Sequence, residues 1–144
     1  MKPSLRHLLS KSLHIFRGVE KYDRKKIGKV GEDIACKYLI RRGYTIVTRN
    51  YSTPIGEIDI VAENGDVLVF VEVKMKRSDT YGMPYEAINL KKQRKLIRLA
   101  QLYIKNKNLY NRKARFDIVS ILGRGRFKRK SIQLIKNAFY ADTL

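Results

Sequence analysis

The chain has 144 residues, which is enough for one domain with a substantial hydrophobic core. Its 32 Lys and Arg residues against 13 Asp and Glu residues give a formal net charge of +19 and a sequence pI near 10.2. So large an excess cannot be neutralised within the chain, and it favours a polyanionic partner, nucleic acid first.

No stretch approaches the roughly 20 apolar residues that a membrane span requires, and the amino terminus lacks the features of a secretory signal. The one cysteine, Cys36, cannot form an internal disulfide, which suits a reducing compartment. We therefore expect a cytoplasmic protein without a membrane span.

Residues 1–26 are predicted to form a basic amphipathic appendage, which could dock on the domain, mediate a homodimer or touch an anionic surface. The compact domain is predicted over residues 27–144, beginning with a helix over residues 28–42 that Gly43 ends. Glu32 falls on the apolar face of this helix with Cys36 and Leu39. A carboxylate there is costly unless it is paired or metal-bound, although it could also interact with the helix dipole.

Further elements are predicted in chain order. A strand over residues 44–50 and a loop over residues 51–55 precede a hairpin over residues 57–76. A loop over residues 77–84 leads to a helix over residues 85–105, followed by strands over residues 115–122 and 131–135 that flank a basic turn. The order of one helix, three strands, one helix and two strands predicts an α/β fold with a central mixed sheet.

The hairpin carries the most informative pattern. A turn at Asn64-Gly65 would place Asp59 opposite Phe70 and diagonal to Glu72, about 7 Å away. Because side chains alternate along a strand, one face would gather Asp59, Phe70, Glu72 and Lys74. The opposite face would be an aliphatic core wall made of Ile58, Ile60, Val69, Val71 and Val73.

Two carboxylates on adjacent strands repel each other unless a cation or a shared proton compensates. Oxygen ligands without a His or Cys cluster suit a hard ion, Mg²⁺ or Mn²⁺. Lys74, beside Glu72, could stabilise charge developing on phosphorus or position the attacking water. The ordinary alternative is a solvated strand face with weak cross-strand ion pairs.

The extended pattern resembles the bacterial YraN-like family of proposed endonucleases. It is carried by Gly31-Glu32, Asn50-Tyr51, Gly56-Glu57-Ile58-Asp59 and Phe70-Val71-Glu72-Val73-Lys74, and it continues through Gly82-Met83-Pro84, Lys92-Gln93 and Arg115-Phe116-Asp117. That family belongs to the PD-(D/E)XK, restriction-endonuclease-like superfamily, which also includes archaeal Holliday junction resolvases. The resemblance implies an αβββαβ core and metal-dependent phosphodiester cleavage.

The resemblance also implies roles for individual residues. Asp59 and Glu72 match the two superfamily acids and Lys74 the motif lysine, while Glu32 resembles an additional acid on the first helix. Lys92 or Gln93 matches an accessory position on the second helix. Ile58 replaces the proline of the nominal motif, and many superfamily members also lack that proline.

Together these observations predict a Mg²⁺- or Mn²⁺-dependent endonuclease, with DNA favoured over RNA as the substrate and branched or otherwise structured DNA as one option. Asp59, Glu72, the Val73 carbonyl and Glu32 would hold the metal. The alternatives are a non-catalytic nucleic-acid-binding protein on the same fold and an assembly factor bound to ribosomal RNA by charge. Contacts to the phosphate backbone are expected from basic residues around the site, namely Arg77, Lys91, Arg94, Arg124 and Arg126.

Overall fold

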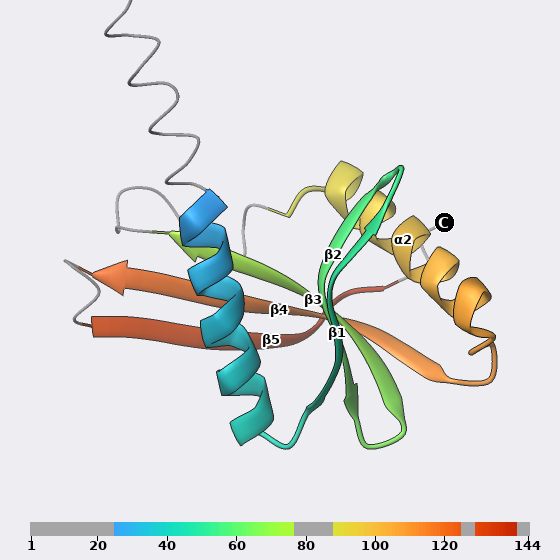
Figure 1. Ribbon diagram of the computed structural model, residues 1–144, viewed down its shortest axis with the longest axis horizontal. Helices are drawn as coiled ribbons and strands as arrows, with labels where there is room; N and C mark the ends of the chain where they lie inside the picture. Colours follow the sequence, from blue (N-terminus) through green and yellow to red (C-terminus); the bar gives the residue numbers. More distant parts are fainter. Residues whose placement is uncertain (1–24, 77–87, 125–128, 141–144) are drawn as a thin grey trace, which may run out of the picture. The chain divides into compact units, whose positions relative to one another are not determined.

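The computed structural model describes residues 25–76, 88–124 and 129–140 (Figure 1). The chain divides into two compact units between Val30 and Gly31, and the fold below is that of the second unit. Several predicted features lie outside the described residues, namely most of the appendage, the loop with Gly82 and Pro84, residues 85–87 of the predicted second helix, Arg77 and Arg126.

A first helix covers residues 25–41 and is followed by β1 (Thr45–Thr53), β2 (Gly56–Asn64) and β3 (Val67–Lys76). The helix α2 (Leu90–Lys107) then leads to β4 (Lys113–Arg124) and β5 (Arg129–Phe139). The predicted order of helices and strands is therefore confirmed. Gly43 follows the first helix with a φ of +85°, as expected of a glycine C-cap.

The five strands form one mixed sheet in the order β1-β2-β3-β4-β5 (Figure 1). β3 and β4 pair in parallel, whereas the other neighbours pair antiparallel. The parallel pair requires a crossover, which α2 provides between β3 and β4. The predicted α/β class with a central mixed sheet flanked by helices is confirmed, and the arrangement agrees with a restriction-endonuclease-like core.

Each face of the sheet carries its own hydrophobic core. On one face, Leu68 and Phe70 of β3 pack with apolar residues of α2, including Leu96 and Tyr103. On the other face, the alternate β3 residues Val69 and Val71 pack with the first helix through residues that include Ala35 and Leu39. The hairpin face that carries Phe70 is therefore not an open charged wall, because α2 covers it.

The turn of the hairpin differs from the prediction by one residue. Asn64 pairs with Val67, so that Gly65 and Asp66 form the turn. Gly65 has a φ of +61°, and a glycine at the first of two turn positions is typical of a type II′ turn. This change shifts cross-strand partners by two residues, which preserves the faces of the paired side chains but moves Asp59 away from Phe70.

The β2–β3 ladder ends at the pair Ile60–Val71, and Asp59 and Glu72 are the next residues along the two strands. The strands separate there, and Ile58 packs in the core beneath α2 with Phe70 instead of joining Val69 and Val71. The predicted aliphatic wall is therefore wrong at Ile58. Separation of the strands also exposes the backbone of Val73 to the Asp59 side chain.

Element ends also differ from the predictions. β1 continues to Thr53, and the predicted loop over residues 51–55 shortens to a turn at Pro54 and Ile55. α2 begins at Leu90, because the side chain of Asn89 accepts a hydrogen bond from the Lys92 N–H and caps the helix. β4 and β5 are longer than predicted. Among the described residues, no helix has the length and apolar character needed to cross a membrane.

Candidate metal centre and nucleic-acid interface

Asp59 lies at the point where β2 leaves β3. Its Oδ2 accepts a hydrogen bond of 2.8 Å from the backbone N–H of Val73, which fixes the carboxylate between the separating strands. Burial raises the pKa of Asp59 from 3.8 to about 7, with the charges of Glu72 and then Glu32 adding to the effect. The Val73 hydrogen bond and the charge of Lys92 oppose that rise.

Glu72 is buried on β3, with 6% of its side chain exposed. Its Oε1 lies 3.3 Å from Lys92 Nζ and 3.7 Å from Lys74 Nζ. Its Oε2 is, among the described residues, the one buried side-chain oxygen or nitrogen without a hydrogen-bond partner. Buried carboxylate oxygens are normally satisfied, so this atom requires a functional or structural explanation.

Asp117 on β4 provides an internal comparison, because it is buried to a similar degree. Its carboxylate accepts hydrogen bonds from the Tyr44 hydroxyl, the Arg115 Nε and the Asn137 backbone N–H. Both carboxylate oxygens of the buried Asp117 therefore have hydrogen-bond donors. Glu72 differs from Asp117, because its Oε2 has no hydrogen-bond partner among the described residues.

A second group of acids includes Asp59, its β2 neighbour Glu57 and Glu32 of the first helix. One carboxylate oxygen each from Glu32, Glu57 and Asp59 lie within 4.8 Å of one another. Glu32 is 16% exposed and comes from the first helix, and Arg49 Nη2 lies 3.8 Å from its Oε2. Sequence reasoning did not select Glu57 or Arg49 for the site. The spacing of Glu57 two residues before Asp59 was the available signal for the former.

These donors fit a divalent cation. All are carboxylate oxygens, no His or Cys belongs to the described group, and one buried oxygen lacks a partner. Asp59 is common to both sets of acids, because its carboxylate groups with Glu32 and Glu57 and it follows the last β2–β3 ladder pair together with Glu72. The site could therefore hold Mg²⁺ or Mn²⁺ through Asp59, Glu72 and Glu32.

The two accessory positions on α2 have different surroundings. Lys92 reaches Glu72 and is thus part of the site. The Gln93 side-chain amide instead donates to the carbonyl of Ile88, before the start of α2. The structure therefore brings Lys92, and not Gln93, to the carboxylates.

A basic stripe follows one face of α2, the helix that also carries Lys92. We define it as Lys91, Arg94, Lys95 and Arg98, which with Ile55 line a surface hollow of about 490 Å³. Lys91 and Arg94 were predicted to bind phosphate, whereas Lys95 and Arg98 were missed. Their spacing of i, i+3, i+4 and i+7 was the signal for one helix face. The predicted contacts Arg77 and Arg126, and the side chain of Arg124, lie outside what the structure describes.

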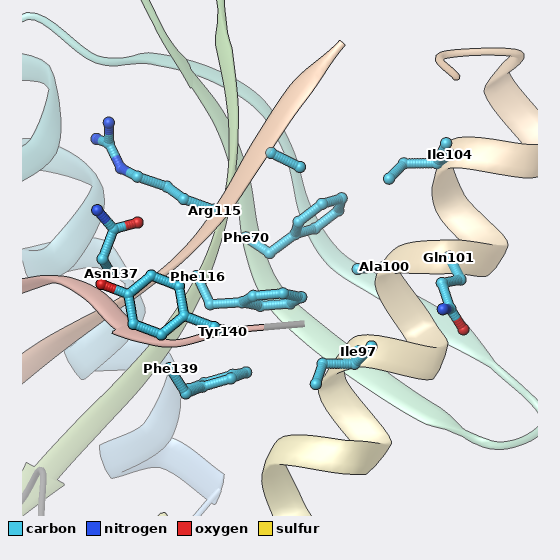
Figure 2. A pocket seen from close by; sticks show the side chains of 11 residues that line it. Phe70, Ile97, Ala100, Gln101, Ile104, Arg115, Phe116, Asn137, Phe139 and Tyr140 are labelled. Carbon is cyan, nitrogen blue, oxygen red and sulfur yellow. The ribbon is translucent and has the colours of Figure 1, made fainter. Parts of the chain in front are cut away.

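A separate cavity of about 180 Å³ lies between α2 and the sheet (Figure 2). Phe70, Phe116 and Phe139 form one wall and Ile97 and Ala100 of α2 the other. The Arg115 side chain extends away from α2 in Figure 2, toward its partner Asp117. The cavity wall is therefore mainly apolar, and the cavity does not include the carboxylates.

Comparisons with known proteins identify the family. The model of the uncharacterised protein family UPF0102 matches residues 31–121, which include both the carboxylates and the basic stripe. A UPF0102 protein of Dictyoglomus turgidum is 42% identical over 117 residues, which cover 81% of this chain and 99% of the relative. A UPF0102 protein of Alkaliphilus metalliredigens is 47% identical over 116 residues, or 80% of this chain and 98% of the relative. The chain therefore belongs to the family UPF0102, which is the YraN-like family.

Proposed function

We propose that this protein is a metal-dependent endonuclease that hydrolyses phosphodiester bonds in DNA. The observation that carries this proposal is the Glu72 carboxylate, which is buried with one unpartnered oxygen next to Asp59. A buried carboxylate in a purely structural ion pair normally has both oxygens satisfied, as Asp117 does. The net charge of +19 supports a polyanionic substrate.

Asp59, Glu72, Glu32 and the carbonyl of Val73 would hold Mg²⁺ or Mn²⁺. Glu57 is within reach of the same group. When bound, the ion would act as a Lewis acid on the phosphate and lower the pKa of a coordinated water. Asp59 must lose its proton before it can act as a ligand, and a cation at the site favours that loss.

The two lysines at Glu72 have separable roles. Lys74 is 32% exposed, so its ammonium can reach both Glu72 and a substrate phosphate. It would orient the attacking water and stabilise the negative charge that develops on the phosphate oxygens. Lys92 is nearer to Glu72 and would position that carboxylate from α2.

The test is cleavage of labelled nicked, branched, single-stranded and duplex DNA, with Mg²⁺, Mn²⁺ or EDTA. We expect cleavage only with metal, and a loss of about 100-fold or more in Asp59→Asn, Glu72→Gln and Lys74→Met. Asp66→Asn is the matched control, because it makes the same chemical change on the same hairpin at an exposed carboxylate.

Three results would overturn the proposal. They are absence of cleavage of every substrate, cleavage that continues in EDTA, and cleavage by Asp59→Asn at the wild-type rate. Binding without cleavage would instead favour the non-catalytic nucleic-acid-binding alternative. Parallel reactions with RNA of the same sequences test the choice of DNA.

A further inference from the structure

Ile55 is an exposed apolar residue surrounded by cations. It lies in the turn between β1 and β2 with 46% of its surface exposed, and it lines the hollow with the basic stripe of α2. An isolated aliphatic side chain at a surface is ordinary by itself. Its position among four cations is what suggests a partner with both phosphates and an apolar surface.

The turn holds Ile55 in a fixed position. The Thr53 hydroxyl accepts from the Ile55 backbone N–H at 3.2 Å and donates to the Gly56 carbonyl at 3.1 Å. Gly56 has a φ of +149°, and a Cβ there would lie 2.5 Å from Lys95 Cε. The missing side chain therefore lets the Lys95 stem lie against the turn, which joins Ile55 to the stripe.

The stripe has the charge and length to follow a phosphate backbone. α2 contains no Asp or Glu, and none of the four cations has an ion-pair partner among the residues the structure describes. From Lys91 to Arg98 the helix rises about 10 Å, which matches a few consecutive phosphates of one strand. A backbone held along the stripe would present its bases or sugars to Ile55.

We propose that Ile55 is a wedge that inserts where base stacking is interrupted, and that the substrates are nucleic acids with a nick, flap, fork or mismatch. This rests on the proposed nuclease function for the identity of the substrate. Apolar side chains, Ile included, enter base steps in many DNA complexes, while nearby cations hold the backbone. Insertion costs least where stacking is already broken, so the wedge would select such positions.

The wedge and the metal centre share their supporting elements. Ile55 precedes Asp59 by four residues of the same chain segment, and Lys91 adjoins Lys92. Four extended residues span at most about 13 Å, which is about four stacked base steps. A cut made by this site would fall within that distance of the discontinuity.

The test uses full-length protein in EDTA, with 2-aminopurine placed beside a flap or in intact duplex. We expect wild type to raise the fluorescence at the flap and to bind flap DNA about tenfold more tightly than intact duplex. Ile55→Ser should lose most of both effects while binding intact duplex within about twofold of wild type, because its cations are unchanged. Arg98→Gln should weaken binding to both DNAs by a similar factor.

Val47→Ser is the matched control, because Val47 is also 46% exposed but lies on β1 outside the hollow. The wedge is overturned if Ile55→Ser retains the fluorescence rise and the preference, if Val47→Ser loses them equally, or if wild type binds no DNA. Circular dichroism confirms that each variant is folded. Since no metal is present, a wild type that inserts Ile55 but never cuts would defeat only the nuclease proposal.

Discussion

Asp59 and Glu72 place two carboxylates at the point where β2 and β3 separate, and burial there disfavours the charged form of Asp59 by raising its pKa. Lys74 and Lys92 form ion pairs with one carboxylate oxygen of Glu72. The Val73 N–H donates a hydrogen bond to one carboxylate oxygen of Asp59. The metal-free protein therefore carries electrostatic strain at this site. Replacing one of these carboxylates by a neutral side chain should therefore change the free energy of unfolding.

Replacing Asp59 by Asn should stabilise the metal-free protein at neutral and higher pH. In the folded protein its pKa is raised to about 7, so between pH 4 and pH 7 the folded chain keeps a proton that the unfolded chain has lost. The stability of wild type therefore falls as pH rises through that window and levels off above it. Asn is always neutral, can still accept from Val73, and should gain on the order of 2 kcal/mol at pH 8.

Urea unfolding in EDTA at several values between pH 4 and pH 8 measures this difference. The gain should be smallest near pH 4, where wild-type Asp59 is largely protonated in both states. Asp66→Asn should follow the wild-type curve, because that side chain is 77% exposed. Parallel curves for Asp59→Asn and wild type would contradict the raised pKa.

At the scale of elements, the residue that caps the start of α2 also holds the turn that carries Lys92 of the site. The Asn89 side chain accepts from the Lys92 N–H at 2.9 Å, and the first turn contains no acidic residue that could replace this cap. Asn89→Ala should therefore cost about 1 kcal/mol of unfolding free energy and loosen the turn that carries Lys92. Asn89→Asp keeps an acceptor and adds a favourable charge at the helix amino terminus, so it should be at least as stable as wild type.

Thermal and urea unfolding of both variants provide the measurement. Amide hydrogen exchange of the first turn of α2 should rise in Asn89→Ala and not in Asn89→Asp. Equal stability of Asn89→Ala and wild type would show that the cap contributes nothing. A loss shared by both variants would indicate that packing of Asn89, and not the hydrogen bond, is responsible.

Local patterns in the sequence predicted the elements but not their detailed pairing. The alternation in β2 and β3 and the helical spacing in α2 depend on nearby residues, and these elements are confirmed. The hairpin register depends on which residue takes a positive φ in the turn. Asn64-Gly65-Asp66 allows the turn at Asn64-Gly65, as predicted, or at Gly65-Asp66, as observed. Ile58 was misplaced because strand separation after Ile60 is a tertiary effect that alternation cannot reveal.

For the candidate site too, local patterns predicted some residues, whereas tertiary contacts between elements could not be predicted. Asp59, Glu72 and Lys74 were predicted because they share one face of a hairpin, a local property. Lys92 was expected only from the family resemblance, since its contact with Glu72 joins α2 to β3. Arg49 near Glu32 joins β1 to the first helix, and no local spacing relates these two residues.

At the scale of the whole molecule, the acidic residues that the structure describes are largely committed within the fold. Several form ion pairs at the sheet, as in Asp33–Arg49, Glu63–Arg112, Asp66–Lys113 and Asp117–Arg115. The basic stripe lacks such partners among the described residues, so part of the +19 excess is concentrated on one face of α2. A local concentration of charge should bind nucleic acid differently from the same charge spread over the surface.

Two variants of equal net charge distinguish these possibilities. Lys91→Gln/Arg94→Gln/Arg98→Gln removes three cations of the stripe, and Lys37→Gln/Arg41→Gln/Lys107→Gln removes three exposed cations elsewhere, so both lower the formal charge from +19 to +16. Each phosphate contact contributes about 0.9 to the slope of log affinity against log salt on duplex DNA. The stripe variant should therefore lose up to about 2.7 of that slope, and the control variant much less. Fluorescence anisotropy in EDTA from 50 to 200 mM salt (about the range over which the effect is large) measures both slopes. Equal losses would mean that DNA responds to the total charge of the protein, and the stripe would then have no special part in binding.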